Sequence, residues 1–310
     1  MNLKQLKFSL AVVINILTAI TFGYYCFLGE NFRTMGDKEK SIISAAVIIL
    51  LLIGTSLGAK KLKQTKRNCK RCLIWEIVLL FFFTSITAYS TYSYFSHYFV
   101  VSAKESIIKS KLIGNISEVE KMYPDYKAYV ETRVDIYENK LSAAILNKNG
   151  QQIELTRLGM DINAPVSLEI QKKSQLDKIN NKLLSPTFND IKTIDSTYLA
   201  KAKVSINNWE PISLVDVINN IGTNTTSSLN KLVSFSKEKA RGEEDYPDFI
   251  PSTPTLHNVK NNFTTIGTPS PFSIVLAIIG YVLMLLSWYI TKRDSRCTGA
   301  LTTADYEVVL

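Results

Sequence analysis

The stretch IVLLFFFTSITAYSTYSYFSHYFVV, residues 77–101, decides the fold class, because none of its 25 residues is Lys, Arg, Asp or Glu. About 20 apolar residues are enough to cross the hydrocarbon core of a bilayer as a helix. Further uncharged stretches of 21, 19 and 21 residues occur at 8–28, 41–59 and 271–291. The sequence therefore predicts an α-helical polytopic membrane protein with four transmembrane helices. It excludes a soluble single-domain enzyme, a disordered protein and a disulfide-rich secreted module.

The positive charge of the chain is concentrated between the second and third predicted helices. The 310 residues carry a formal net charge of +9. Segment 60–72 contains no acid and seven bases, which are Lys60, Lys61, Lys63, Lys66, Arg67, Lys70 and Arg71. Because short cytoplasmic loops are rich in Lys and Arg, we expect this loop, the N-terminus and the tail 292–310 in the cytoplasm. Residues 102–270, with 21 bases and 20 acids, are then extracytoplasmic.

The same loop indicates the partners and the compartment. A basic run between two transmembrane helices is a topology determinant that can contact lipid head groups, so we expect the lipid bilayer and no nucleic acid as its partner. No cysteine occurs in 102–270, so that domain needs no disulfide. This favours a bacterial inner membrane with a periplasmic domain. Cys69 and Cys72 have C-x-x-C spacing without a second pair, and we expect a reduced pair that binds no zinc.

The third predicted helix carries an unusual polar line, and the second carries a glycine pair. The line consists of Thr84, Thr87, Thr91, Tyr94 and Tyr98, which share one face of a regular helix. Such a face is expected in a helix–helix contact, or else along a pore lined by hydroxyls. Gly54 and Gly58 form a G-x-x-x-G pair that fits close packing within one subunit or a dimer face. The absence of a central charge from all four stretches argues against an ion-coupled pump.

Region 102–270 is predicted to be a mostly helical domain between the third and fourth transmembrane helices. The apolar stripe from Ile108 to Tyr123 predicts a helix that continues the third transmembrane helix and ends or kinks at Pro124. Further helices are expected at 165–184, 188–206, 211–222 and 225–240, and QIELTR, residues 152–157, is expected as a short strand. Residues 241–271 form a Pro-rich strap that returns to the membrane.

The chain lacks the motifs of catalytic sites. It has only two histidines and contains neither H-E-x-x-H nor G-x-S-x-G, nor a glycine-rich phosphate loop. We therefore expect no catalytic residue, no cofactor and no metal. The composition favours a non-enzymatic structural, scaffolding or signal-relaying subunit of an envelope complex, either a homo-oligomer or bound to other membrane proteins. The alternative is a homo-oligomeric channel lined by the third helix.

Overall fold

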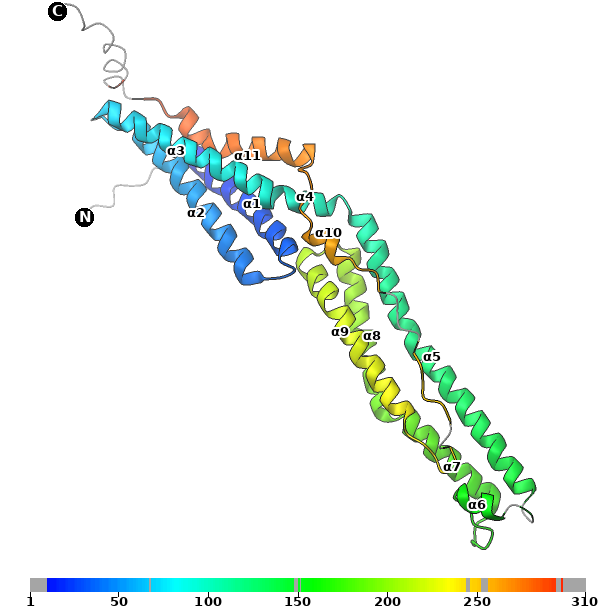
Figure 1. The fold of residues 1–310 in the computed structure, drawn as a ribbon. Coiled ribbons are helices and arrows are strands. Elements are labelled where there is room, and N and C mark those ends of the chain that lie inside the picture. The colour runs from blue at the N-terminus through cyan, green and yellow to red at the C-terminus, as the bar shows by residue number, and fades with distance from the viewer. Residues whose placement is uncertain are drawn as a thin grey trace, which may run out of the picture. The chain divides into compact units, whose positions relative to one another are not determined.

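The computed structural model describes residues 10–66, 68–147, 150, 152–243, 246–251, 256–293 and 297. All regular elements among these residues are helices. The chain divides into a first unit, Met1–Ser106 with Lys260–Leu310, and a second unit, Ile107–Val259. Figure 1 shows the order of the helices along the chain.

The first unit is a bundle of long apolar helices. It contains α1 (Leu10–Arg33), α2 (Lys38–Lys63), α3 (Cys69–Ser90), η1 (Thr91–Phe95), α4 (Ser96–Ser102), the short α10 (Lys260–Thr264) and α11 (Pro271–Ile290). Three segments are long and apolar enough to cross a membrane: α1, α2 and the continuous run Cys69–Ser102. The apolar stretch Pro271–Met284 within α11 is shorter. The chain is therefore a helical membrane protein with three candidate spans.

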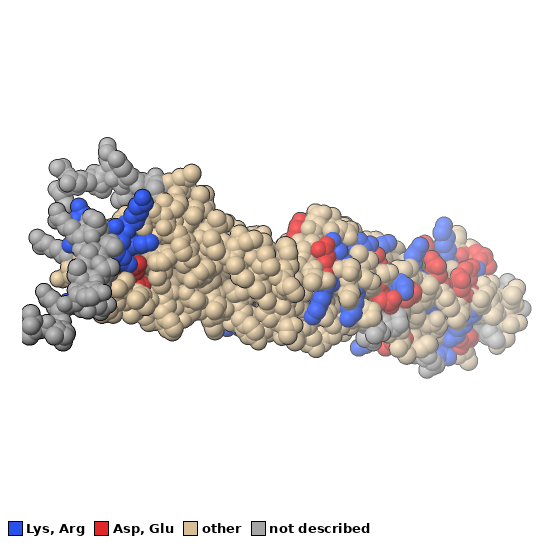
Figure 2. Space-filling model, turned by 90° about the horizontal axis from the view of Figure 1, so that it is seen from above, with Lys and Arg blue, Asp and Glu red and all other residues tan. Residues whose placement is uncertain are grey.

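The four long segments of the first unit share one core. Phe22 from α1, Leu52 from α2, Phe83 from α3 and Met284 from α11 belong to one buried cluster. Charged residues gather at the end of the bundle formed by Lys60–Lys63, the start of α3 and Arg293, which we call the basic end. Figure 2 shows a broad surface without Lys, Arg, Asp or Glu next to it.

The third predicted span is not one regular helix. Residues 91–95 form a π-helix, η1, between α3 and α4. The expected continuation into the next domain is also interrupted, because α4 ends at Ser102 and α5 begins at Glu105. In the intervening turn, the Lys104 N–H donates to the Val101 carbonyl at 2.9 Å, which is the shorter i→i−3 pattern of a tightened helix end.

The second unit is built on α5 (Glu105–Leu146), a helix of 42 residues. Of the two outcomes predicted at Pro124, an end of the helix or a kink, the end was wrong, because Pro124 lies inside α5. Proline removes one backbone donor and crowds the preceding turn. On either side of it, however, Tyr123 and Tyr126 are buried. Burial of these large side chains offsets the lost hydrogen bond and keeps the helix continuous.

The expected strand at 152–157 was also wrong. These residues form α6 (Gln152–Arg157), which buries Leu155. A single strand without a partner leaves its backbone groups unpaired, whereas the helical turn pairs the Leu158 N–H with the Glu154 carbonyl at 2.9 Å. The helix therefore satisfies the backbone locally.

The remaining helices of the second unit are α7 (Leu168–Leu183), α8 (Pro186–Asn207) and α9 (Pro211–Ser236). The two helices expected around Gly222 are one, α9, whose apolar face buries Ile218, Leu229 and Leu232. Between α5, α8 and α9, Asp195 accepts hydrogen bonds from the hydroxyls of Tyr123 and Ser228. Burial, together with this bond, raises the pKa of Tyr123.

The Pro-rich strap lies along α5 within the second unit (Figure 1). The Asn115 side chain donates to the His257 carbonyl at 3.2 Å and accepts from the His257 N–H at 2.7 Å. Further along, the Tyr129 hydroxyl donates to the Pro247 carbonyl at 2.9 Å. These bonds satisfy strap backbone that has no regular structure of its own.

Candidate functional site

The candidate site is the half of the third predicted span that carries the polar line. Its first three members, Thr84, Thr87 and Thr91, lie together along a groove of about 250 Å³ against α11. The α11 side of the groove is formed by Ile274, Ala277, Ile278 and Tyr281. The Thr84 hydroxyl lies 3.0 Å from that of Tyr281, within hydrogen-bond distance. These threonines therefore face another helix of the same chain.

The hydroxyls of this groove are largely used by the protein itself. Thr84 Oγ1 donates to the Leu80 carbonyl at 2.9 Å, and Thr87 Oγ1 donates to the Phe83 carbonyl at 2.8 Å. Such back-bonding lets a hydroxyl sit in an apolar setting without an unpaired donor. Most of the remaining lining is aliphatic or aromatic. The groove is consequently suited to packing rather than to the passage of a hydrated ion.

Tyr94 and Tyr98, the last two members of the line, face α1. Tyr94 lies under the Arg33 guanidinium, 5.0 Å from it, and Tyr98 stacks on Phe32 with ring centres 5.9 Å apart. The π-helix explains the division, because one extra residue in a turn rotates all later side chains by about 100° around the helix axis. A regular helical spacing would have kept all five residues on one face.

The glycine pair of α2 has two different surroundings. A Cβ atom at Gly58 would lie 3.0 Å from Leu79 Cδ1 of α3, whereas one at Gly54 would meet nothing within 4 Å. Closer helix approaches occur at two glycines of α1 outside this pair. A Cβ atom at Gly23 would collide with Ile49, and one at Gly29 would collide with the Tyr94 carbonyl in η1. The only sequence signal for Gly23 and Gly29 was that they lie in an apolar helix. Gly54 and Gly58 carry the same signal, so it does not distinguish the four positions.

A buried polar network joins three helices nearer the basic end. Asn15 of α1 donates to the Ser56 hydroxyl of α2 at 3.0 Å and to the Met284 carbonyl of α11. It also lies 3.4 Å from the Ser287 hydroxyl. Asn15, Ser56 and Ser287 are all buried. A buried amide is stable in an apolar bundle only when its hydrogen bonds are made, so this network fixes how α11 lies against α1 and α2.

At the basic end, α11 is held by charge. Glu76 accepts from Trp288 Nε1 at 2.9 Å and from Arg293 Nη2 at 2.6 Å. Lys63 donates to the Trp288 carbonyl at 3.0 Å and lies over its ring, 4.2 Å from the centroid. The other topology residues lie at the end of α2, in the connecting loop and in the first turn of α3: Lys60, Lys61, Lys66, Lys70 and Arg71. Arg67 lies outside the described residues.

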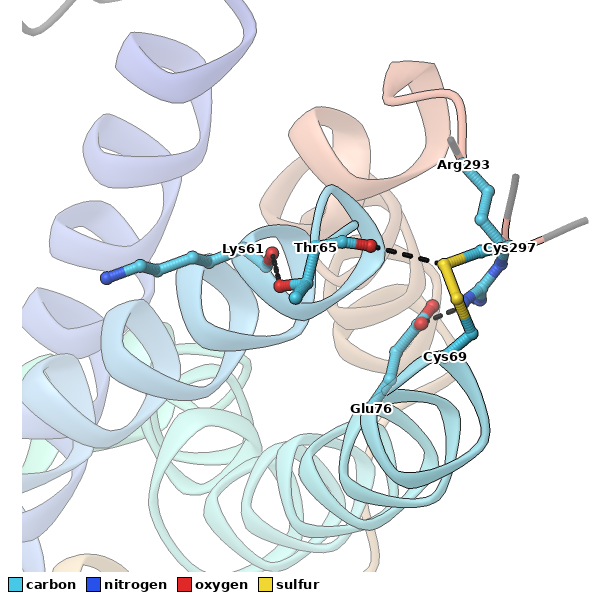
Figure 3. Close-up of a disulfide and its surroundings, with 6 residues drawn as sticks. All are labelled: Lys61, Thr65, Cys69, Glu76, Arg293 and Cys297. Carbon is cyan, nitrogen blue, oxygen red and sulfur yellow. Dashed lines mark hydrogen bonds and ion pairs between the residues drawn. A yellow bond between two sulfur atoms is a disulfide. The ribbon is translucent and has the colours of Figure 1, made fainter. Parts of the chain in front are cut away.

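The cysteines of the basic end correct the expectation of a plain reduced pair. Cys69 forms a disulfide with Cys297, across a Cα–Cα distance of 5.3 Å. Figure 3 shows this bond beside the Glu76–Arg293 ion pair, with Thr65 and Lys61 nearby. The bond connects the start of α3 to the segment that follows α11. A disulfide is typical of an oxidising compartment, whereas the charge of the same loop predicts the cytoplasm.

Comparisons of the chain with protein-family models, with curated proteins and with solved structures found no match. Within the described residues, no group of three or more His, Cys, Asp or Glu side chains is placed to hold a metal ion. The contacts of the site are those between packed helices: hydroxyls bonded to carbonyls, stacked aromatic rings and closely approaching glycines.

Proposed function

We propose that the chain is a non-enzymatic membrane subunit with four transmembrane helices that acts by association in a cell envelope. Its second unit and strap form the extracytoplasmic part, and α11 is the fourth span. The role is scaffolding or relaying a signal within a complex, either as a homo-oligomer or with other membrane proteins of an inner membrane.

Contacts along the whole of α11 support four spans. Near its start, the Ser273 hydroxyl donates to Ser96 at 3.1 Å. In its middle, Tyr281 meets Thr84, and near its end Trp288 donates to Glu76. From Ser273 to Trp288 a helix rises by about 22 Å. A helix that contacts the run Cys69–Ser102 at these three levels extends over most of a bilayer core, which fits a transmembrane position better than a surface position.

One observation carries the proposal of association: α3 and η1 expose polar and aromatic side chains on the outside of the bundle. Tyr89 of α3 is 61% exposed, and Ser85 is exposed as well. Tyr92 of η1 is 58% exposed and stands at the edge of the groove against α11. Ser85 and Tyr89 also line a second groove of about 470 Å³ between α2 and α3, with Ile43, Val47 and Leu51 on its α2 side. A hydroxyl that would otherwise face lipid is stabilised when another helix offers it a hydrogen-bond partner. A partner helix that covers Ser85, Tyr89 and Tyr92 would supply it.

The test compares two triple variants of the full chain in detergent by size-exclusion chromatography with light scattering. We expect the wild type to be larger than one chain, alone or with a co-purifying protein. Ser85→Leu, Tyr89→Leu and Tyr92→Leu together should release a single chain. The matched control, Thr84→Leu, Thr87→Leu and Thr91→Leu, should stay assembled and lose thermal stability, because those threonines contact α11 within the chain.

Other outcomes would contradict the proposal. If the wild type is a single chain without a partner, the proposed association is wrong. If the two triple variants dissociate equally, Ser85, Tyr89 and Tyr92 do not form the association surface. Ion flux from wild-type protein in liposomes, abolished by the threonine variant without dissociation, would favour a channel. Loss of membrane insertion in the first variant would assign Tyr89 and Tyr92 to an interfacial aromatic belt instead.

A further inference from the structure

The second unit contains a pocket of about 320 Å³ in which basic side chains converge. It lies where the segment after α6, one face of α7 and the segment after α9 meet. Its lining is Gly159, Gln175, Lys178, Ile179, Lys182, Lys239, Ala240 and Arg241. None of these residues is acidic. In a region whose acids and bases nearly balance, four bases around one hollow are a local concentration of positive charge.

Packing and backbone hydrogen bonds hold the pocket in place. Ile179 is buried, which fixes the face of α7 on which Lys178 and Lys182 are one turn apart. On the other side, the Tyr137 hydroxyl donates to the Arg241 carbonyl at 3.1 Å, and the Ala240 N–H donates to Glu243 Oε2 at 2.8 Å. The basic side chains therefore extend from backbone that is anchored to the core.

Gly159 lets the two sides of the pocket approach. Its φ of +77° lies in the left-handed region that favours glycine. A Cβ atom there would lie 2.9 Å from Arg241 Cδ and 3.0 Å from Gln175 Nε2. Gln175 instead donates to the Gly159 carbonyl at 3.1 Å. A larger residue would push Arg241 out of the pocket.

The charges of the pocket are only partly neutralised. Lys239 pairs with Asp248 at 2.7 Å, and Lys182 makes a half-exposed pair with Glu238 at 3.6 Å. Lys178 and Arg241 make no ion pair with any described residue. Among the described residues these two cations are therefore without a carboxylate partner, and the guanidinium of Arg241 has a planar fork that matches the oxygens of a phosphate.

We propose that this pocket binds a small polyvalent anion carrying a phosphate group, of about the size of pyrophosphate or a sugar phosphate. Its volume is at the lower end of the range of small-molecule sites, which excludes a folded polymer and leaves room for more than one phosphate group. Arg241 and Lys178 contact the phosphate oxygens, Lys182 and Lys239 line the pocket while paired with Glu238 and Asp248, and the Gln175 amide helps to orient the ligand. This binding function is separate from the association proposed above.

The test is isothermal titration of the full chain in detergent with pyrophosphate at constant ionic strength. We expect saturable binding that weakens as sodium chloride is raised. Lys178→Gln with Arg241→Gln should weaken binding by at least about tenfold, because each removes a charged hydrogen bond. The matched control, Lys192→Gln with Lys201→Gln at two exposed positions of α8, removes the same charge and should change affinity by less than about twofold.

Two further measurements keep the result interpretable. Lys178→Gln alone replaces an exposed α7 residue, so it should leave the melting temperature unchanged and still weaken binding. Glucose 1-phosphate and short-chain phosphatidic acid are then compared as ligands. Tighter binding of the first would identify a soluble ligand, and of the second a lipid head group, and both would support the phosphate site. No saturable binding of pyrophosphate, or equal weakening in pocket and control variants, would overturn it.

Discussion

Arg133 is the residue on which the strap of the second unit depends most. Its side chain is fully buried on α5 and forms an ion pair with Glu243 at 3.0 Å. It also donates to the Ser236 carbonyl at 2.8 Å, at the end of α9. Burial by itself would lower the pKa of Arg133, but the hydrogen bonds and charge of Glu243 outweigh it, and the pKa is raised. The guanidinium stays charged and connects α5, α9 and the strap.

We expect Arg133→Met to destabilise the second unit by about 3–5 kcal/mol, because Glu243 is left buried without its partner. The measurement is chemical or thermal unfolding of the full chain followed by circular dichroism. Lys127→Met is the control: its pair with Glu131 at 3.5 Å is exposed, so the loss should be under about 1 kcal/mol. Adding Glu243→Gln to Arg133→Met should restore part of the stability. Equal effects of the two single variants would contradict this role of Arg133.

At the scale of elements, the π-helix η1 is the feature that organises the third span. Gly29 of α1 lies directly against its Tyr94 carbonyl, so the two backbones touch. We expect Gly29→Ala to separate α1 from η1 and to lower the melting temperature of the first unit, despite the better helix propensity of alanine. Gly54→Ala is the control, because a Cβ there enters open space. It should be neutral or stabilising, and a loss as large as that of Gly29→Ala would argue against the contact.

The sequence predicted the elements better than their interruptions. The long apolar runs predicted a helical membrane protein, because the length of an uncharged apolar run can be counted directly in the sequence. The π-helix carries no such signal, and with it Tyr94 lies under Arg33 of α1 rather than toward α11. Local propensity predicts that the helices are interrupted at Pro124 and Gly222. Burial of Tyr123, Tyr126 and Ile218 outweighs that propensity. Residues 152–157 have no partner strand among the described residues, and the sequence of these six residues alone does not reveal that.

The same limit applies to the candidate site. The spacing correctly grouped Thr84, Thr87 and Thr91, because residues three or four positions apart lie on the same face of a helix. It could not reveal the partner of Asn15, because Ser56 and Ser287 are far away in sequence. Nor could it pair Cys69 with Cys297, which are 228 positions apart. The basic pocket was equally hidden, since Lys178 and Arg241 come from separate elements.

At the scale of the whole molecule, the charge of segment 60–72 places the basic end in the cytoplasm, whereas the disulfide there is typical of an oxidising compartment. One experiment distinguishes the two. We expect the second unit outside, because the seven bases of 60–72 outweigh any other loop charge. A cysteine placed at the exposed Ser227 of an otherwise cysteine-free chain should therefore react with an impermeant maleimide on intact spheroplasts. If segment 60–72 is cytoplasmic, as proposed, Cys69 and Cys297 should be recovered from cells as thiols, because the cytoplasm reduces disulfides. After purification, mild oxidation should join them, since their Cα atoms are 5.3 Å apart, within disulfide range. The opposite pair of results, a protected cysteine at position 227 and a disulfide already formed in cells trapped by rapid alkylation, would invert the proposed topology.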